Sequence, residues 1–306
     1  MNITKKREPF DYAALCRSLE EISARYKEAK IYDIGKSVTG RKLYVIEIGK
    51  GSNKVFYNGA HHGMEWLTSA LLVKFAKEYL ACIKKGRFIF SVNSEYLFKN
   101  VTLYLLPIVN PDGVEISIHG ARIYTADYPR LFAQNNYNSD FTHWQANFNG
   151  VDLNHNYDAL WERSKEEEVR HNILGPGPTR YAGKYPFSEP ETAAMRDFTL
   201  REKFKLVMAF HSQGQEIYYS FNDREPIYSL GLAKAMTAGT PYTAAVPEGI
   251  SSYGGYKDWF IERFSRPGFT VEIGKGENPL PMTELDKVYD ETLSLLIGGM
   301  KAASII

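Results

Sequence analysis

The sequence predicts an α/β protein built on a mixed sheet that helices cover on both faces. Short apolar runs typical of buried strands alternate along the chain with longer segments whose apolar residues recur at helical spacing. Side chains able to bind a metal follow directly after several of these runs. In sheets of this kind, ligands collect beyond the carboxyl ends of the strands. The pattern therefore predicts a functional site at one edge of the sheet.

Size and composition favour one domain over residues 1–306. The chain is near the upper end of what one core supports, and 44% of its residues are hydrophobic. The formal net charge of +1 argues against a nucleic-acid-binding surface, and no obligate protein partner is evident. No apolar run is long enough to cross a membrane, and no signal peptide is recognisable. We expect Cys16 and Cys82 to be reduced and the protein to be cytoplasmic, or secreted if a signal or wall-binding module has been removed.

The first half of the chain shows helix and hairpin patterns before a buried strand. Asp11 can cap a first helix, and two alternating runs flank Val38-Thr-Gly-Arg41, which is a hairpin pattern. A central strand ends in the turn Asn110-Pro-Asp-Gly113. The expected helices are 11–26 and 65–84, and the expected strands are 30–36, 42–48, 54–60 and 101–109.

The second half begins with a long segment, 113–188, that we expect to be mostly loop and to wall the site. Ser188-Glu-Pro-Glu191 then has the pattern of a capping box with proline in the first turn of a helix. The remaining expected strands are 205–210, 216–221 and 269–273, and the remaining expected helices are 226–238, 256–263 and 284–303.

Two residues at a strand-to-helix corner and a third at the end of a distant strand form a candidate metal site. His62 and Glu65 follow the strand at 54–60, and His211 follows another buried strand. A hydrolytic zinc site takes three protein ligands, of which His2Glu is one known set, and leaves a fourth position for water. Alone, His-x-x-Glu could equally be a core histidine beside an acidic helix start. His61 is not expected to bind, because neighbouring side chains in an extended segment point in opposite directions.

Glu272 is the candidate general base. It lies in the apolar run Phe269-Thr-Val-Glu-Ile273, where a solvent-facing glutamate would fit poorly. A metal lowers the pKa of its water to roughly 7 and polarises a carbonyl. A carboxylate beside it can take the proton of the water and return it to the leaving nitrogen, which contributes on the order of 10²–10⁴ in rate.

These residues lie in four motifs that resemble, in order and spacing, the zinc metallocarboxypeptidase family. The motifs are Gly59-Ala-His-His-Gly-Met-Glu-Trp66, Gly150-Val-Asp-Leu-Asn-His-Asn156, Ala209-Phe-His-Ser212 and Thr270-Val-Glu-Ile-Gly274. The resemblance runs from about residue 30 onward. It implies a three-layer α/β/α sandwich with a mixed sheet of about eight strands, and one zinc ion per chain. It assigns the zinc to His62, Glu65 and His211, and the base and acid role to Glu272.

Departures from the family concern the substrate. Carboxypeptidases that trim a free C-terminus hold its carboxylate with an Asn-Arg pair, which here is Asn154-His155, so the bidentate arginine is missing. Met64 replaces another arginine, and Gln145 stands near the place of the arginine that stabilises the oxyanion. We expect Asn154, His155 and Gln145 to contact substrate. Three arginines could take the place of the oxyanion-stabilising one, and the sequence does not choose among them: Arg122, Arg130 and Arg180.

Two tyrosines and a lysine complete the expected substrate contacts. The tyrosine that closes over substrate in the family has no clean counterpart, although Tyr253 and Tyr256 lie close by. Lys257 follows Gly254-Gly255 at a position that in the family tends to line the base of the pocket for the leaving residue. A lysine there suits a carboxylate, or is simply a surface lysine at a helix start.

The same departures resemble one branch, the γ-D-glutamyl-diamino acid endopeptidases of bacterial cell-wall peptides. The resemblance implies a zinc peptidase that cleaves the γ-D-glutamyl amide of small murein peptides, with lysine or diaminopimelate as the leaving residue. A conventional carboxypeptidase, an amidase on other γ-linked or small N-acyl substrates, and an inactive zinc-binding scaffold are the alternatives. The loss of arginine at position 155 opposes the first, and retention of Glu272 with all three ligands opposes the last.

Overall fold

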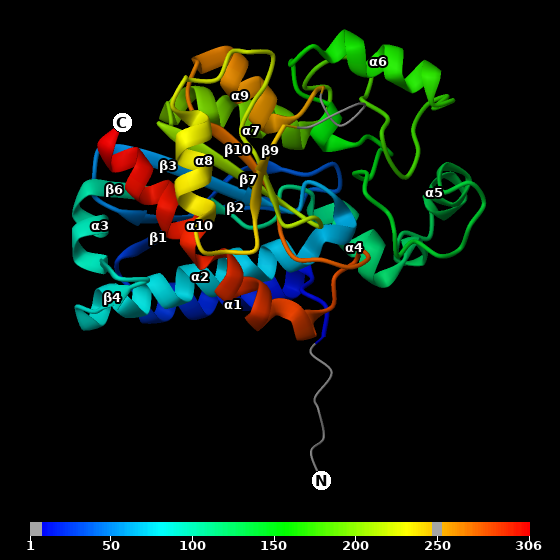
Figure 1. Cartoon of the computed structure of the whole chain (residues 1–306). Coiled ribbons are helices and arrows are strands. Elements are labelled where there is room, and N and C mark those ends of the chain that lie inside the picture. The colour runs from blue at the N-terminus through cyan, green and yellow to red at the C-terminus, as the bar shows by residue number, and fades with distance from the viewer. Residues whose placement is uncertain (1–7, 247–252) are drawn as a thin grey trace.

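An eight-stranded mixed sheet lies at the centre of the computed structural model, which describes residues 8–246 and 253–306 (Figure 1). The strands run in the order β1-β2-β6-β3-β7-β10-β8-β9. Their bounds are β1 (Ala29–Lys36), β2 (Lys42–Gly49), β3 (Asn53–Gly59), β6 (Val101–Leu106), β7 (Leu206–His211), β8 (Glu216–Tyr218), β9 (Thr243–Ala245) and β10 (Gly268–Glu272). The four neighbours β6, β3, β7 and β10 are parallel, so their carboxyl ends meet at one edge. This confirms the predicted mixed sheet.

Helices cover both faces of the sheet, as the sandwich prediction requires (Figure 1). One face carries α1 (Tyr12–Arg25), α2 (Trp66–Lys85), α3 (Ser94–Asn100), α8 (Ser229–Thr237) and α10 (Leu285–Ile305). The other carries α7 (Pro190–Glu202) and α9 (Tyr256–Phe264). A short hairpin of β4 (Phe88–Ile89) and β5 (Val92–Asn93) lies apart from the main sheet.

Strand β3 shows why the apolar runs become central strands. Val55 and Tyr57 belong to the core under α2 and α10, whereas Phe56 points to the opposite face. There Phe56 stacks on Phe204 with ring centroids 4.9 Å apart and meets Phe198 edge-on. Each such side chain contributes roughly 1.5–3 kcal/mol when fully buried. A strand with both faces buried must be apolar throughout, which fixes its place in the middle of the sheet.

The segment after β6 is more ordered than predicted. Asn110 accepts a hydrogen bond from the backbone N–H of Gly113 at 2.8 Å, so the expected turn is the capped start of a helix. The segment contains α4 (Pro111–His119), α5 (Tyr128–Gln134) and α6 (Trp161–Arg170). It also has its own small core, formed by Ile116, Ala121, Leu131, Phe141, Trp144, Ala146 and Phe148. Most of the segment still lies outside helices and strands, as predicted, but these helices and this core give it more order than the sequence suggests.

Helix α7 begins where predicted but without the predicted capping box. Its N-cap is Glu189, which makes no capping hydrogen bond through its side chain. The carboxylate of Glu191 instead accepts a hydrogen bond from the backbone N–H of Val38 at 3.1 Å. The residue that local spacing assigns to the cap thus fastens the helix to the hairpin between β1 and β2.

Neither cysteine is in a disulfide, and both are partly buried: Cys16 and Cys82. In the described ranges no helix combines the length and apolar character needed to cross a bilayer.

Candidate active site

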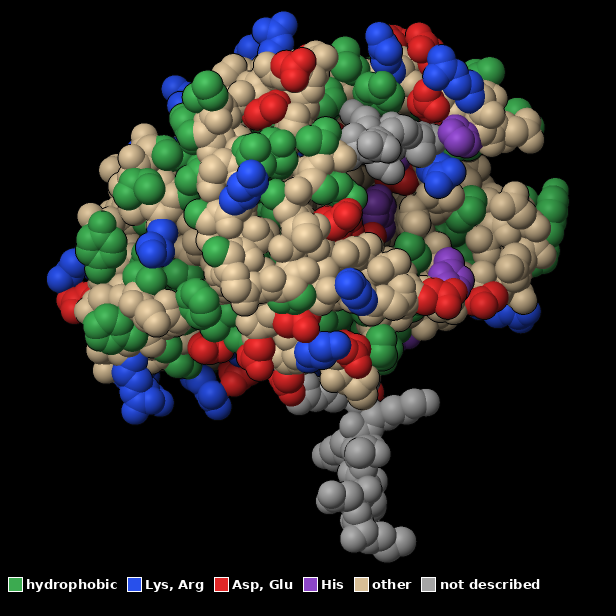
Figure 2. Space-filling view, in the orientation of Figure 1, with side chains coloured by type: hydrophobic (Ala, Val, Ile, Leu, Met, Phe, Trp, Pro, Cys, Tyr) green, Lys and Arg blue, Asp and Glu red, His purple; other side chains and the backbone are tan. Residues whose placement is uncertain are grey.

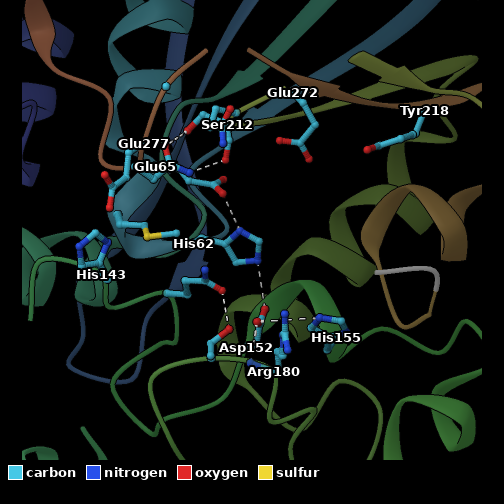
Figure 3. A pocket seen from close by; sticks show the side chains of 16 residues that line it. His62, Glu65, His143, Asp152, His155, Arg180, Ser212, Tyr218, Glu272 and Glu277 are labelled. Atoms are coloured by element: carbon cyan, nitrogen blue, oxygen red, sulfur yellow. Dashed lines mark hydrogen bonds and ion pairs between the residues drawn. The ribbon is translucent and has the colours of Figure 1, made fainter. Parts of the chain in front are cut away.

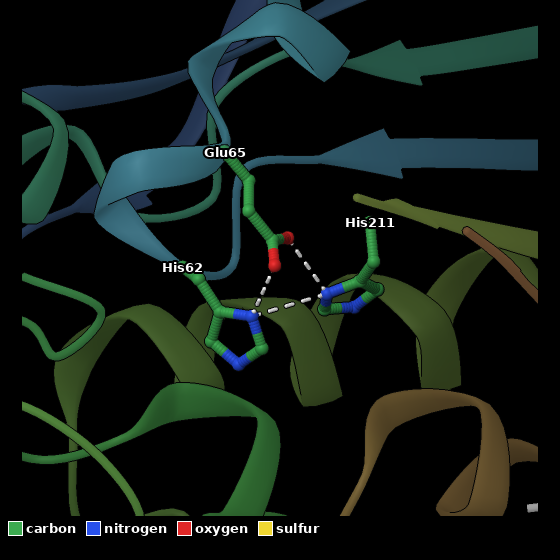
Figure 4. A group of neighbouring side chains, drawn as sticks. All are labelled: His62, Glu65 and His211. Carbon is green, nitrogen blue, oxygen red and sulfur yellow. Dashed lines mark hydrogen bonds and ion pairs between the residues drawn. The ribbon is translucent and has the colours of Figure 1, made fainter. Parts of the chain in front are cut away.

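The corner after β3 positions two of the expected metal ligands. The chain leaves the strand through Ala60 and enters the 3₁₀ turn Gly63–Glu65. At Gly63, an added Cβ would lie 2.3 Å from the carbonyl oxygen of Gly113 and 2.8 Å from that of Trp144. Only glycine allows this close approach of three backbone segments. The tight corner turns the side chains of His62 and Glu65 to the same side (Figure 4).

Three side chains converge on one point at the edge of the sheet (Figure 4). The Nδ1 atoms of His62 and His211 are 3.3 Å apart. The carboxylate of Glu65 faces both rings, with Oε1 at 2.9 Å from His62 Nδ1 and Oε2 at 3.0 Å from His211 Nδ1. His61 is outside this group, and its Nε2 lies 3.0 Å from the hydroxyl of Tyr157.

The spacing of these atoms suits a tetrahedral zinc ion. Two nitrogen ligands at about 2.1 Å from a tetrahedral ion are about 3.4 Å apart. The observed separation of the two Nδ1 atoms, 3.3 Å, matches this value. Two imidazoles and one carboxylate are also a ligand set that zinc accepts in hydrolytic enzymes, with one position left open. His62, Glu65 and His211 therefore fit a zinc ion.

The charges around the group favour a cation. Burial lowers the pKa of His62, but the carboxylates of Glu65 and Asp152 outweigh it and hold that pKa well above its usual range. Burial raises the pKa of Glu65, yet His62 and His211 bring it below its ordinary value. The carboxylate of Glu65 is thus stabilised by positive charge at the point where the three side chains meet.

Asp152 orients one of the two histidines. Its Oδ1 lies 3.2 Å from His62 Nε2, the nitrogen that faces away from the metal position. Metal-binding histidines usually donate the N–H of their second ring nitrogen to such a carboxylate, which fixes the ring and its tautomer. The Nε2 of His211 is buried and has no partner within the described residues. Of the two histidines, His62 is therefore the one whose orientation a neighbouring carboxylate controls.

Glu272 is placed by the strand pairing itself. In the parallel ladder of β7 and β10, Glu272 is the direct partner of His211. Its carboxylate projects into the pocket near the metal-binding group (Figure 3). Burial, followed by the negative charge of Glu65, raises the pKa of Glu272 well above its ordinary value. A carboxylate that readily holds a proton beside a metal position can act as base and then as acid.

His62, Glu65 and Glu272 line a pocket of about 740 Å³ at the carboxyl edge of the parallel strands. The space-filling view shows a hollow with histidine and acidic side chains inside it (Figure 2). The other residues that complete its lining are Met64, His143, Gln145, Asp152, His155, Thr179, Arg180, Ser212, Gln213, Tyr218, Gly276, Glu277 and Asn278.

Two of the six expected substrate contacts line this pocket. Gln145 lies in the wall, and its Oε1 accepts a hydrogen bond from the hydroxyl of Thr179. His155 also faces the pocket, with Nδ1 held at 3.1 Å from the carbonyl oxygen of Tyr253. Its Nε2 lies 4.0 Å from Asp152 (Figure 3). An imidazole therefore stands where the family pattern has an arginine.

The structure does not bring the other four into the pocket. The Oδ1 of Asn154 accepts from the backbone N–H of Tyr256, whose own ring is fully buried with its hydroxyl 2.9 Å from Thr199 Oγ1. Lys257 is 3% exposed, and its ammonium donates to the carbonyl of Ser220 and pairs with Asp258. Tyr253 lines a separate cavity of about 330 Å³. This geometry gives no support to a free lysine ammonium at the base of the main pocket.

Several pocket residues have no role in the sequence reasoning. Asp152 is part of a recognised motif and could have been found there, since it is a carboxylate two residues before the Asn-His pair and could bind a histidine or another cation. Tyr218, His143 and Glu277 carry no local pattern, and only the folded chain brings them to the pocket (Figure 3).

Comparison with known proteins agrees with the fold and the site. A family model described as zinc carboxypeptidase matches residues 15–294. The chain is 36% identical over 294 residues to γ-D-glutamyl-L-diamino acid endopeptidase 1 of Lysinibacillus sphaericus, covering 96% of this chain and 73% of that protein. It is 30% identical to human carboxypeptidase B, covering 85% and 62%. A crystal structure of thrombin-activatable fibrinolysis inhibitor superposes with a TM-score of 0.74 at 20% identity, covering 96% and 74%. The chain therefore belongs to the zinc carboxypeptidase family and is a zinc metallopeptidase.

Proposed function

We propose that this protein hydrolyses the amide bond between the γ-carboxyl of a D-glutamyl residue and a diamino acid in bacterial cell-wall peptides. One observation carries the proposal. His155 lines the pocket in place of the arginine that holds a free C-terminus, and Gln145 and Met64 line it in place of two other arginines of the family. The similarity to the endopeptidase of L. sphaericus, which spans nearly the whole chain, supports the same substrate.

Each residue of the site has its own role in hydrolysis. His62, Glu65 and His211 would hold the zinc ion. When bound, the ion would polarise the scissile carbonyl and lower the pKa of a water molecule. Glu272 takes the proton of the attacking water and returns it to the leaving amine. Asp152 keeps the ring of His62 in the orientation that points Nδ1 inward.

The polar lining of the pocket suits a small charged peptide. Neutral hydrogen-bonding groups come from both sides, including Gln145, Thr179, Ser212 and Asn278.

The two free thiols fit our expectation of a reducing, cytoplasmic compartment.

A paired-substrate assay tests the proposal. The zinc-loaded protein is incubated with L-Ala-γ-D-Glu-diaminopimelate and, separately, with an ordinary acyl-dipeptide that has a free C-terminus, and products are read by mass. We expect L-Ala-D-Glu and free diaminopimelate from the first and little turnover of the second. Cleavage of the acyl-dipeptide alone would make the protein a conventional carboxypeptidase. Glu272→Gln serves as the control for contaminating peptidase.

A further inference from the structure

Arg180 lies at the wall of the pocket (Figure 3). Its backbone N–H donates to Asp152 Oδ2 at 2.9 Å, while Oδ1 of the same carboxylate faces His62. Asp152 therefore ties the backbone of Arg180 to an expected zinc ligand. The side chain is exposed, and no hydrogen bond or ion pair to another described residue engages its guanidinium.

The charge of the pocket makes this arginine stand out. Four carboxylates line it: Glu65, Asp152, Glu272 and Glu277. Among the described lining residues, Arg180 alone is a lysine or arginine, so it is the permanent side-chain cation available to a ligand. Elsewhere on these walls, a substrate carboxylate would face the negative charge of other carboxylates or neutral groups. Beside the guanidinium it would instead be attracted by an opposite charge.

The other cations considered from the sequence are engaged elsewhere. The guanidinium of Arg122 lies over the ring of Tyr128. Arg130 donates to the backbone carbonyl of Phe148 at 3.0 Å. Neither lines the pocket, and Lys257 is paired with Asp258. Of the three arginines that the sequence leaves open for the oxyanion role, only Arg180 lines the pocket.

We propose that Arg180 is a specificity-determining residue that binds a free carboxylate of the substrate beside the scissile amide. This inference rests on the proposed function, because a γ-linked substrate always offers such a group. Amide formation through the γ-carboxyl leaves the α-carboxylate of the glutamyl residue free, and the leaving diamino acid carries a carboxylate of its own. A planar guanidinium can bind either one through two parallel hydrogen bonds.

The test combines variants of Arg180 with substrates that lack one carboxylate at a time. The variants are Arg180→Gln and Arg180→Lys, chosen without β-branching because the residue has φ of +64°. Arg122→Gln is the matched control, since it removes an exposed arginine outside the pocket. The substrates are L-Ala-γ-D-Glu-diaminopimelate, its isoglutamine analogue with the glutamyl α-carboxylate amidated, and analogues with each leaving-residue carboxylate amidated.

On the parent tripeptide, Arg180→Gln should lower kcat/KM at least roughly ten- to hundredfold, the effect expected for each charge-assisted hydrogen bond lost. One analogue has lost the carboxylate that Arg180 normally binds, and on that analogue Arg180→Gln should have nearly the same kcat/KM as wild type. That analogue therefore identifies which substrate carboxylate Arg180 binds. Arg180→Lys should recover part of the activity. Zinc content and melting temperature should stay at wild-type values.

Equal losses on every analogue, or no loss on the parent, would overturn the assignment. Failure of the proposed function gives a different result: wild type would then leave all γ-linked peptides intact and cleave an ordinary acyl-dipeptide. In that case, comparing wild type with Arg180→Gln on the dipeptide and on its C-terminal amide decides whether Arg180 binds a carboxylate. If neither class is cleaved, calorimetric binding of the intact L-Ala-γ-D-Glu-diaminopimelate to wild type and Arg180→Gln decides it, and equal affinity would reject the proposal.

Discussion

Two regions face each other across the pocket, and they are built differently (Figure 3). The sheet edge comprises His62, Glu65, His211 and Glu272, and the loop wall comprises Gln145, Asp152, His155 and Arg180. In the sheet edge, strand pairing sets residues opposite one another, as with Glu272 and His211. The loop wall belongs to the long segment between β6 and α7, part of which rests on a small core of its own. The residues expected to carry the reaction are thus positioned by the sheet, whereas the residues proposed to contact substrate lie on a segment outside it.

The largest effect is expected from removing a ligand at the sheet edge. His211→Ala leaves two of three protein ligands, so zinc should be lost on dialysis and turnover should fall below detection. Metal analysis checks occupancy, and thermal melting with added zinc checks binding, because a ligand that binds only the folded state raises stability. Full zinc occupancy in the variant would remove His211 from the site.

The next largest effect concerns the base. Glu272→Gln keeps the size of the side chain but cannot accept the proton of water, so turnover should drop by ~10²–10⁴ while zinc content stays unchanged. Rates on the γ-linked tripeptide and zinc content are measured on the same preparation. Near wild-type turnover would move the role to another carboxylate of the pocket, such as Glu277.

Asp152 tests whether the two regions are independent. It belongs to the loop wall but holds His62 through Nε2 at 3.2 Å. Asp152→Asn should lower zinc affinity or activity ~10- to 100-fold, as for other carboxylates that orient a metal ligand. Competition with a chelator measures the affinity. A change in substrate preference with unchanged zinc affinity would instead confine Asp152 to the loop wall, through its bond to the backbone of Arg180.

A smaller effect, on the free energy of unfolding, is expected from Glu191, which binds the segment that carries the loop wall. Glu191 is fully buried, and its Oε2 lies 3.2 Å from the amide of Asn147. Burial, followed by the charge of Asp112, raises its pKa to about 8. The folded state therefore keeps a proton that the unfolded chain releases near pH 4.3.

Stability should consequently fall as pH rises from about 4.3 to about 8 and level off above, with a contribution from this group of at most ~1.4 kcal/mol per pH unit. Glu191→Gln mimics the protonated form and should flatten that part of the profile. Denaturant unfolding at a series of pH values measures it. An unchanged slope in the variant would mean that Glu191 does not hold the extra proton.

The smallest effect is expected at Lys257. Because its ammonium already pairs with Asp258 and Ser220, Lys257→Met should leave the ratio of rates on diaminopimelate and lysine substrates unchanged. The double variant with Asp258→Asn avoids a buried, unpaired carboxylate, which would cost roughly 3–5 kcal/mol. A selective loss on diaminopimelate peptides in the double variant would restore Lys257 as a substrate contact.

The sequence was sufficient where a single local pattern decides the structure. The apolar runs of β3 and β7 predict central strands, and the residues that follow them, His62 and His211, come together as expected because parallel strands end at one edge. The resemblance to a known family supplied the number of strands. These parts depend on periodicity and chain order, both of which are visible in the sequence.

The rest depends on partners that the sequence does not reveal. Lys257 was placed by its offset from a glycine pair, yet Asp258 and a distant carbonyl take its charge inside the fold. Asn110 was assigned to a turn, because a cap and a turn use the same residues and only the following contacts distinguish them. Arg180 could not be separated from Arg122 and Arg130 until the path of the long segment was known.

The close contact at Gly63 has a consequence for how such a site can diversify. There the corner that carries His62 touches the carbonyl groups of Gly113 and Trp144, so the sheet edge meets its surroundings backbone to backbone. The Gly63 N–H also donates to the carbonyl of Gln145 at 2.9 Å. None of these contacts involves a variable side chain. Replacing the side chain at position 145, 155 or 180 would therefore leave this junction intact, and related enzymes could acquire new substrates through single substitutions that keep the metal centre in place.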